Sequence, residues 1–342
     1  MNNSESQEFG NAQVEPDVYE QLLDMTWGYI VTQAVFIATQ LGVPDVVSTV
    51  PMDVDEIARR IGADRSSLYR LMRFLASKGI FSQPKPQYFV ETPLSNGLRT
   101  DAVNGEHWMA LMRGAEFYRC WAEALQSFRT GKPVFELVYG LPFFEYLAQH
   151  PERSALFDKG MAEKASQKLS VLLSYDWKKA NLITDIGGGN GSTIAAVLRS
   201  APHLNGILFD LPTVVESADA ILQKAGVRDR CKIIAGNFFK DPLPATDVMI
   251  LSEILHDWDD EHARAILENC HRTLANDGRL LLVEGVVPDD QNPNEMKLMD
   301  LHMLVLLGGK ERTESEWKTL LEKAGFQLAR IYPAGMIEAR PV

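Results

Sequence analysis

Cysteine is scarce in this chain of 342 residues, which has three, and no two of them form a CxxC pair. Disulfide frameworks and structural zinc sites need cysteines in closely spaced pairs, so the sequence excludes both and suits a reducing compartment. Lysine and arginine are missing from the first 50 residues, which hold seven acidic residues. Secretory signals and transit peptides need basic residues there, so we expect neither and predict a cytoplasmic protein.

Long apolar runs are missing as well. The longest candidate, residues 30–47, is interrupted by Gln33, Gln40, Pro44 and Asp45, so it falls short of the ~18 apolar residues of a membrane helix. We therefore predict no membrane association. The formal net charge is −12, which argues against nucleic acid as the main partner, because affinity for nucleic acid comes from Lys and Arg on phosphates.

Composition and periodicity divide the chain into four parts. Residues 1–15 are polar without apolar periodicity, which predicts a flexible N-terminus. Residues 16–103 predict one helix over 19–41, then helices over 54–61 and 66–78 followed by a β-hairpin. Residues 104–175 predict helices rich in aromatic side chains. Residues 176–342 alternate strands and helices, so we predict an α/β fold with a mostly parallel, doubly wound sheet.

A helix–turn–helix followed by a hairpin is the winged-helix layout, which has two interpretations. Arg65, Arg70 and Arg73 would lie near a DNA-recognition helix. Residues 51–100, however, carry only eight basic against five acidic residues, and the acidic residues 1–50 outweigh this excess. The broad apolar stripe over 19–41 favours burial against a second subunit. We therefore prefer a winged-helix-like dimerisation domain that binds no nucleic acid.

The sharpest motif is D-I-G-G-G-N-G, residues 185–191, where the first strand of the α/β part becomes a helix. Its glycines at 187, 189 and 191 form G-x-G-x-G, because Ser192 stands where a dinucleotide fingerprint needs its third glycine. Such a turn cradles the amino-acid part of S-adenosylmethionine (SAM), although a generic nucleotide loop remains an alternative. Glycine permits the tight turn and the close approach of a ligand to the backbone.

Two further loops point to a nucleoside. Asp210 ends the second strand, 23 residues after Gly187, where an acidic side chain accepts hydrogen bonds from ribose hydroxyls. Gly236, Asn237 and Phe238 follow the next strand, where a polar side chain would bind the adenine edge and a phenylalanine would pack on the ring. Because three loops follow successive parallel strands, we expect them to converge on one ligand.

His256 lies in S-E-I-L-H-D-W-D-D-E, residues 252–261, after the fourth strand. Methyl transfer to a phenol requires loss of the phenolic proton, and restoring the anion at pH 7 costs about 4 kcal/mol for a pKa of ~10. A histidine takes that proton in the transition state, and does so better when a carboxylate holds its other nitrogen. Glu284 and Glu311 are the two candidates for that carboxylate, and a surface charge or a helix cap is the alternative for each.

At this point the sequence resembles a known family, the SAM-dependent small-molecule O-methyltransferases typified by plant caffeic acid enzymes and by bacterial enzymes of antibiotic and other aromatic secondary metabolite biosynthesis. The resemblance runs from about Tyr19 to the end. It rests on these motifs: D-I-G-G-G-N-G, F-D-L-P, G-N-F-F, L-H-D-W-D-D-E, E-N-C-H-R-T-L, V-E-G-V-V-P and G-G-K-E-R-T-E-S-E-W. It implies a class I methyltransferase fold with a seven-stranded sheet and an N-terminal dimerisation domain that forms a homodimer.

The resemblance also implies roles for single residues. His256 would be the general base, flanked by Glu284 and Glu311. The expected cofactor-binding residues are Gly187, Gly189, Asp210, Leu211, Gly236, Asn237, Phe238 and Ser252. Asn237 replaces the usual aspartate and still has an oxygen to accept from the adenine amino group. Ser252 replaces the lysine of plant members, which indicates the bacterial branch.

The acceptor is expected to be a small aromatic metabolite of the phenol, polyketide or phenazine type. Its pocket is expected to be lined by Met109, Met112, Phe143, Phe157, Met161, Asp257, Met296, Met299, Asp300 and Met303, because methionine suits flat ligands of several shapes. No metal is implied. N-methylation or SAM-dependent hydroxylation on the same scaffold stays open, and so does a winged-helix transcription factor that senses SAM.

Overall fold

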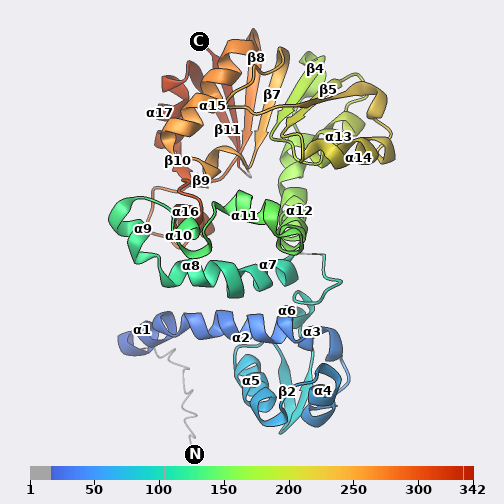
Figure 1. The fold of residues 1–342 in the computed structure, drawn as a ribbon, viewed down its shortest axis with the longest axis vertical. Coiled ribbons are helices and arrows are strands. Elements are labelled where there is room, and N and C mark those ends of the chain that lie inside the picture. The colour runs from blue at the N-terminus through green and yellow to red at the C-terminus, as the bar shows by residue number, and fades with distance from the viewer. Residues whose placement is uncertain (1–16, 104, 334) are drawn as a thin grey trace, which may run out of the picture. The chain divides into compact units, whose positions relative to one another are not determined.

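The structure is a computed structural model that describes residues 17–103, 105–333 and 335–342 (Figure 1). The predicted flexible N-terminus lies outside these residues. The chain forms two compact units, with the boundary between Ala102 and Val103. Each unit has its own core and is described by itself.

The first unit is mostly helical. Its helices are α1 (Val18–Thr26), α2 (Gly28–Gln40), α3 (Val43–Val46), α4 (Val54–Ile61), α5 (Arg65–Ser77) and α6 (Pro93–Asn96). Strands β1 (Met52–Asp53), β2 (Ser82–Lys85) and β3 (Tyr88–Val90) form an antiparallel sheet in the order β1–β3–β2. Ile57, Leu68, Met72, Leu75 and Phe89 are buried, so α4, α5 and the hairpin share one core. The predicted order of two helices and a hairpin is observed.

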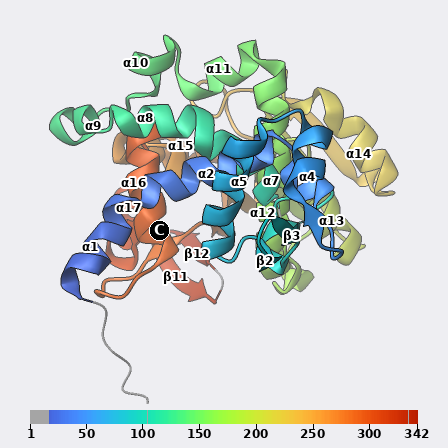
Figure 2. The ribbon, with the colours of Figure 1, turned by 90° about the horizontal axis from the view of Figure 1, so that it is seen from below.

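The single helix predicted over 19–41 was wrong, because the chain bends by 42° between α1 and α2. The Thr26 hydroxyl donates to the carbonyls of Leu22 and Leu23, and Gly28 follows, a combination that favours a kink. α1 extends beyond the bundle of α3, α4 and α5 (Figures 1 and 2). Within the described chain, no residue of α1 is buried. No single described helix is long and apolar enough to cross a membrane, although the bent pair α1–α2 taken together has the length and composition.

The second unit begins with a helical layer. It contains α7 (Glu106–Met112), a π-helical turn (Arg113–Phe117), α8 (Tyr118–Ala122), α9 (Leu125–Thr130), α10 (Phe135–Tyr139), α11 (Phe143–Gln149) and α12 (Pro151–Leu173). Aromatic and sulfur-containing side chains of these helices pack together with Val305 and Leu306 of α16 (Glu295–Leu306). The helical layer therefore shares a core with a helix from the C-terminal part of the chain.

A seven-stranded sheet completes this unit, in the order β11–β12–β8–β7–β4–β5–β6. The parallel strands are β4 (Leu182–Ile186), β5 (Asn205–Asp210), β6 (Cys231–Ala235), β7 (Thr246–Ser252) and β8 (Leu274–Val283). Strands β11 (Phe326–Tyr332) and β12 (Met336–Pro341) are antiparallel at one edge. The predicted mostly parallel sheet is confirmed.

The sheet lies between helices α13 (Ser192–Ser200), α14 (Ala218–Lys224), α15 (Asp260–Thr273) and α17 (Glu314–Lys323) (Figure 1). Two apolar clusters fill the space between the sheet and these helices. Strand β4 pairs with β5 on one side and with β7 on the other. The chain order reverses there, and ligands of such sheets bind at the carboxyl ends of the strands beside the reversal.

Candidate active site

The glycine turn after β4 has the backbone that its sequence predicts. Gly187, Gly189 and Gly191 have φ values of 68°, 61° and 82°, a left-handed region that other residues adopt at a cost. The Gly187 N–H donates to the Phe209 carbonyl at 2.8 Å. A Cβ at Gly187 would lie only 2.5 Å from Cδ1 of Ile254. The turn is thus a tight cradle that side chains would fill, and its residues fit the amino-acid part of SAM.

Asp210 ends β5 directly beside this turn. Its carboxylate accepts the Gly189 N–H at 2.8 Å and the Leu211 N–H at 2.6 Å. Since a carboxylate accepts about four hydrogen bonds, acceptor capacity remains for two ribose hydroxyls. Burial raises the pKa of Asp210 despite these two donors. The Leu211 side chain is exposed at the same strand end.

A second carboxyl group, that of Asp185, lies next to the glycine turn, and no role was predicted for it. Asp185 is completely buried, and burial together with the charge of Asp210 raises its pKa to about 7. A Cβ at Gly188 would lie 2.6 Å from its Oδ2. In the sequence, Asp185 is the first residue of the glycine motif 185–191, and that position is the signal that could have identified it.

The loop after β6 reaches the same place. A Cβ at Gly236 would lie 2.6 Å from the Phe209 ring, so this glycine also allows close packing. The Asn237 side-chain oxygen accepts the Phe239 N–H at 2.8 Å. That oxygen, which the sequence analysis assigned to the adenine amino group, therefore has one lone pair left. The Phe238 ring comes within 3.8 Å of the Cβ position of Gly187, so the predicted adenine loop and the glycine turn adjoin.

His256 lies in a short 3-10 turn (Leu255–Asp257) after β7, whose last residue is Ser252. Its Nδ1 is 2.7 Å from Oε2 of Glu284. The other oxygen of Glu284 accepts the N–H groups of Ile254 and Leu255 at 3.0 and 2.7 Å. The Glu284 side chain is fully buried at the end of β8. Three donors thus fix the carboxylate, which in turn fixes the ring and leaves Nε2 as the nitrogen that takes up a proton.

Carboxylates around His256 govern its ionisation. Burial works to lower the pKa of His256, but the charges of Glu284, Asp257 and Glu253 outweigh it and hold that pKa well above its ordinary value. Asp257 lies 3.4 Å from Nε2, and burial raises its pKa to about 7 although the imidazole opposes the shift. Glu253 has a positive φ of 59°, and no sequence pattern pointed to it.

Ligand atoms of Glu253, His256 and Glu284 lie within 4.8 Å of one another, a spacing that a metal ion also accepts. The donors on Glu284 already use most of its lone pairs, however, so the arrangement favours a pair that holds a proton. A mechanism without metal stays a prediction.

Glu311 is buried on the loop before β10 (Arg312–Thr313). Its N–H donates to Asp300 of α16 at 3.0 Å. Its carboxylate lies against Gly285, the residue after Glu284, where a Cβ would be 2.9 Å from Oε2. The structure therefore brings Glu311 and Asp300 together beside Gly285, the residue that follows Glu284.

The predicted pocket residues come from two layers. Met109, Met112, Phe143 and Phe157 belong to one apolar cluster of the helical layer, in which the Phe143 and Phe157 rings are 5.1 Å apart. Met161 is partly buried on α12, and α16 carries Met296, Met299, Asp300 and Met303.

One neighbour of this pocket was not predicted. His302 of α16 accepts the Trp121 ring N–H at 3.1 Å and meets the Phe117 ring edge-on at 4.8 Å.

Comparison with known proteins shows the family of the chain. The family model of the O-methyltransferase domain matches residues 121–327, and that of the O-methyltransferase dimerisation domain matches residues 23–101. Phenazine O-methyltransferase PhzM from Lysobacter antibioticus is 42% identical over 94% of this chain and 96% of its own length. O-demethylpuromycin-O-methyltransferase from Streptomyces alboniger is 35% identical over 94% of this chain and 89% of its own.

A solved structure adds the ligands. The O-methyltransferase NcsB1 from neocarzinostatin biosynthesis, in complex with SAM and 2-hydroxy-5-methyl naphthoic acid, has a TM-score of 0.81. It is 31% identical, and the match covers 91% of this chain and 96% of that one.

Proposed function

The chain belongs to the O-methyltransferase family that carries its own dimerisation domain, and on that premise we propose that His256 is the general base for its methyl transfer. The protein is a SAM-dependent O-methyltransferase that acts on an aromatic secondary metabolite. The acceptor we propose is a flat phenol, polyketide or phenazine with a free hydroxyl group.

SAM supplies an electrophilic methyl group to the attacking oxygen. The residues proposed to hold it are Gly187, Gly189, Asp210, Leu211, Gly236, Asn237, Phe238 and Ser252. The Asp210 carboxylate, which we propose binds the ribose, accepts the Gly189 N–H and so ties the two halves of the proposed cofactor site together. Preorganised groups avoid the cost of ordering on binding.

The observation that carries the proposed mechanism is the 2.7 Å contact between Nδ1 of His256 and Glu284. Ile254, two residues before His256, touches the glycine turn at Gly187, which places the imidazole next to the proposed cofactor site. The acceptor hydroxyl would give its proton to Nε2 while its oxygen attacks the methyl carbon and the bond from that carbon to the sulfur of SAM breaks, so that S-adenosylhomocysteine leaves. Glu284 then stabilises the imidazolium, and Glu311 supports the Glu284 arm through Gly285.

The acceptor pocket is proposed to combine Met109, Met112, Phe143, Phe157 and Met161 with the side chains of α16 named above. Asp257 lies beside Nε2, where it would bind a polar group next to the reacting hydroxyl.

We also propose a homodimer through the first unit, since α1 leaves large apolar side chains such as Val18 and Met25 more than three-quarters exposed. Sedimentation analysis of the wild type and of Leu22→Glu checks this, and a wild-type monomer of 38.2 kDa would contradict it.

The mechanism is tested with His256→Ala, using mass spectrometry to follow methyl transfer to a panel of hydroxyphenazines and naphthols. We expect turnover to fall by ~10²–10⁴-fold, the usual contribution of a general base, with SAM affinity by calorimetry unchanged. His203→Ala is the matched control, because Nε2 of His203 bonds to the Trp177 carbonyl at 3.1 Å and the residue is not one of those proposed for the site. Turnover of His256→Ala equal to that of the control would overturn the assignment.

A further inference from the structure

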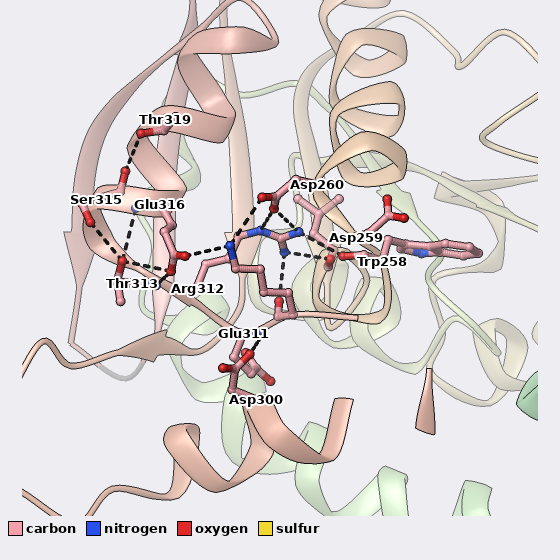
Figure 3. A network of polar contacts seen from close by, with 12 residues as sticks. Trp258, Asp259, Asp260, Asp300, Glu311, Arg312, Thr313, Ser315, Glu316 and Thr319 are labelled. Atoms are coloured by element: carbon pink, nitrogen blue, oxygen red, sulfur yellow. Dashed lines mark hydrogen bonds and ion pairs between the residues drawn. The ribbon is translucent and has the colours of Figure 1, made fainter. Parts of the chain in front are cut away.

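Arg312 is a cation buried beside the site, and no role has been given to it so far. Its side chain is completely buried, which is rare for arginine unless every nitrogen is paired. Nη1 donates to the carbonyls of Leu255 and Lys310, and Nη2 to the carbonyl of Trp258, each at 3.0 Å. Nε donates to Asp260 at 2.9 Å (Figure 3). The guanidinium also lies over the Trp317 ring, 5.1 Å from its centre.

Two of the carbonyl groups that accept from Arg312 belong to residues on either side of the proposed base in the sequence. Leu255 and Trp258 are the residues at either side of the pair His256 and Asp257. The carbonyl of His256 itself accepts the Lys310 N–H at 2.8 Å. Three carbonyl groups of this four-residue turn are therefore held by residues 310–312.

The turn has little internal support. Its own hydrogen bonds, from the Asp257 N–H to Ile254 and from the Trp258 N–H to Leu255, are both 3.3 Å long, beyond the usual range for N–H donors. A Cβ at Gly309 would collide with the His256 carbonyl, so the backbone of residues 309–310 lies directly on the turn. The position of the imidazole is thus set from outside.

Residues 310–312 are also linked to β9 (Val286–Val287), the strand that follows Glu284. Arg312 and Thr313 of β10 pair with Val286 and Val287 of β9 as parallel strands. One side chain therefore links the turn bearing His256 to the strand two residues after Glu284. The 2.7 Å contact between Nδ1 of His256 and Glu284 joins the same two segments.

We propose that Arg312 is a positioning residue that holds the turn of His256 in register with Glu284. This inference rests on the proposed role of His256 as the base. In the described contacts Arg312 touches neither proposed ligand site directly, so its replacement should act through the turn and leave SAM affinity unchanged. Lysine keeps the charge but not the planar fork with donors in several directions, which makes Arg312→Lys the informative variant.

The test is a double-mutant cycle of Arg312→Lys and His256→Ala, read by single-turnover methyl transfer. We expect Arg312→Lys alone to slow transfer by about 10–10²-fold, the loss typical of a misplaced catalytic group, with SAM affinity unchanged. In the His256→Ala background the same change should cost nothing further, because the group it positions is gone. Arg230→Lys is the matched control, since that guanidinium also donates to two carbonyls, of Leu204 and Leu198.

Each failure has its own signature. If His256→Ala is slow while Arg312→Lys transfers at the rate of the Arg230→Lys control, the positioning role alone is overturned. Losses that multiply in the double variant would also overturn it, since Arg312 would then act independently of the base. A wild-type rate in His256→Ala would overturn the base itself and, with it, this inference. If Arg312→Lys does not fold, Asp260→Asn removes the carboxylate on Nε and should give a smaller loss with the same dependence on His256.

Discussion

Two regions of the second unit meet at the carboxyl ends of the strands and are built in different ways. The cofactor edge, defined as the glycine turn 187–191 with Asp210 and Asn237, is assembled from backbone N–H groups and loops that directly follow strands. The catalytic corner, defined as His256, Glu284 and Arg312, is assembled from buried charged side chains that meet across long stretches of sequence.

The difference predicts how each region fails. Removing a side chain from the cofactor edge leaves its backbone donors in place, so binding weakens by the value of one contact. Removing one partner from the catalytic corner leaves a buried charge without compensation, which costs more than the contact itself. Changes in the corner should therefore lower the rate steeply, whereas changes at the edge should lower affinity moderately.

After His256→Ala, the largest effect on the rate is expected for Glu284→Gln. The amide still accepts the N–H groups of Ile254 and Leu255, but its NH₂ group faces Nδ1 of His256 and favours the tautomer with the proton on Nε2. That tautomer takes up no proton from the acceptor, so we expect the rate to fall by about 10²-fold with SAM affinity unchanged. Glu338→Gln is the control, because Glu338 is also buried but pairs with Arg279 on β8. Equal rates in the two variants would show that the corner does not depend on this carboxylate.

Asp210→Ala should act on binding and leave the rate of the chemical step unchanged. The change removes a charged acceptor, which is worth about 1.5–3 kcal/mol, so the Kd for SAM by calorimetry should rise by roughly 10–150-fold. Asp219→Ala serves as the control, since Asp219 is a half-exposed partner of Arg228 on α14. An unchanged Kd in Asp210→Ala would remove this residue from the ribose.

The smallest effect on the rate is expected for a matched pair of glycine variants, which tests whether the glycine turn and the catalytic corner depend on each other. Gly187→Ala and Gly189→Ala suffer the same left-handed strain, of about 1–2 kcal/mol, but only the methyl group at 187 meets Ile254, two residues before the base. Apart from residues 188–190 themselves, no described atom lies within 4 Å of the Cβ position of Gly189. Gly187→Ala should therefore also slow single-turnover transfer, by about 10-fold, and equal rates in the pair would separate the glycine turn from the catalytic corner.

The cofactor edge was predictable from sequence because its geometry is local. Gly187 and Gly189 permit the left-handed backbone of the turn that follows β4, and Asp210 stands 23 residues after Gly187. The mostly parallel sheet followed from the same alternation of strands and helices. The break at Trp27 was missed because it depends on how one hydroxyl, that of Thr26, bonds to the preceding turn.

The catalytic corner was only partly predictable. His256 and Glu284 were named from their places at strand ends, but Glu284 and Glu311 were equal candidates, since nothing local separates two glutamates. In the structure Glu284 contacts the imidazole, and Glu311 lies against Gly285. The role of Arg312 could not be predicted, although the residue lies in the motif G-G-K-E-R-T-E-S-E-W. Its partners include Leu255, 57 residues earlier, and no spacing rule connects the two.

The central claim, that His256 is the base, is tested most directly by the pH dependence of single-turnover methyl transfer in the wild type and in His256→Gln. The surrounding carboxylates raise the pKa of His256, so the imidazole loses its proton only above its ordinary pKa of ~6.5. We predict that the wild-type rate rises with pH and levels off above that raised pKa. The His256→Gln rate should instead climb about tenfold per pH unit towards the pKa of the acceptor itself, so that the gap between the two narrows at high pH. Parallel profiles with a constant ratio would contradict the claim.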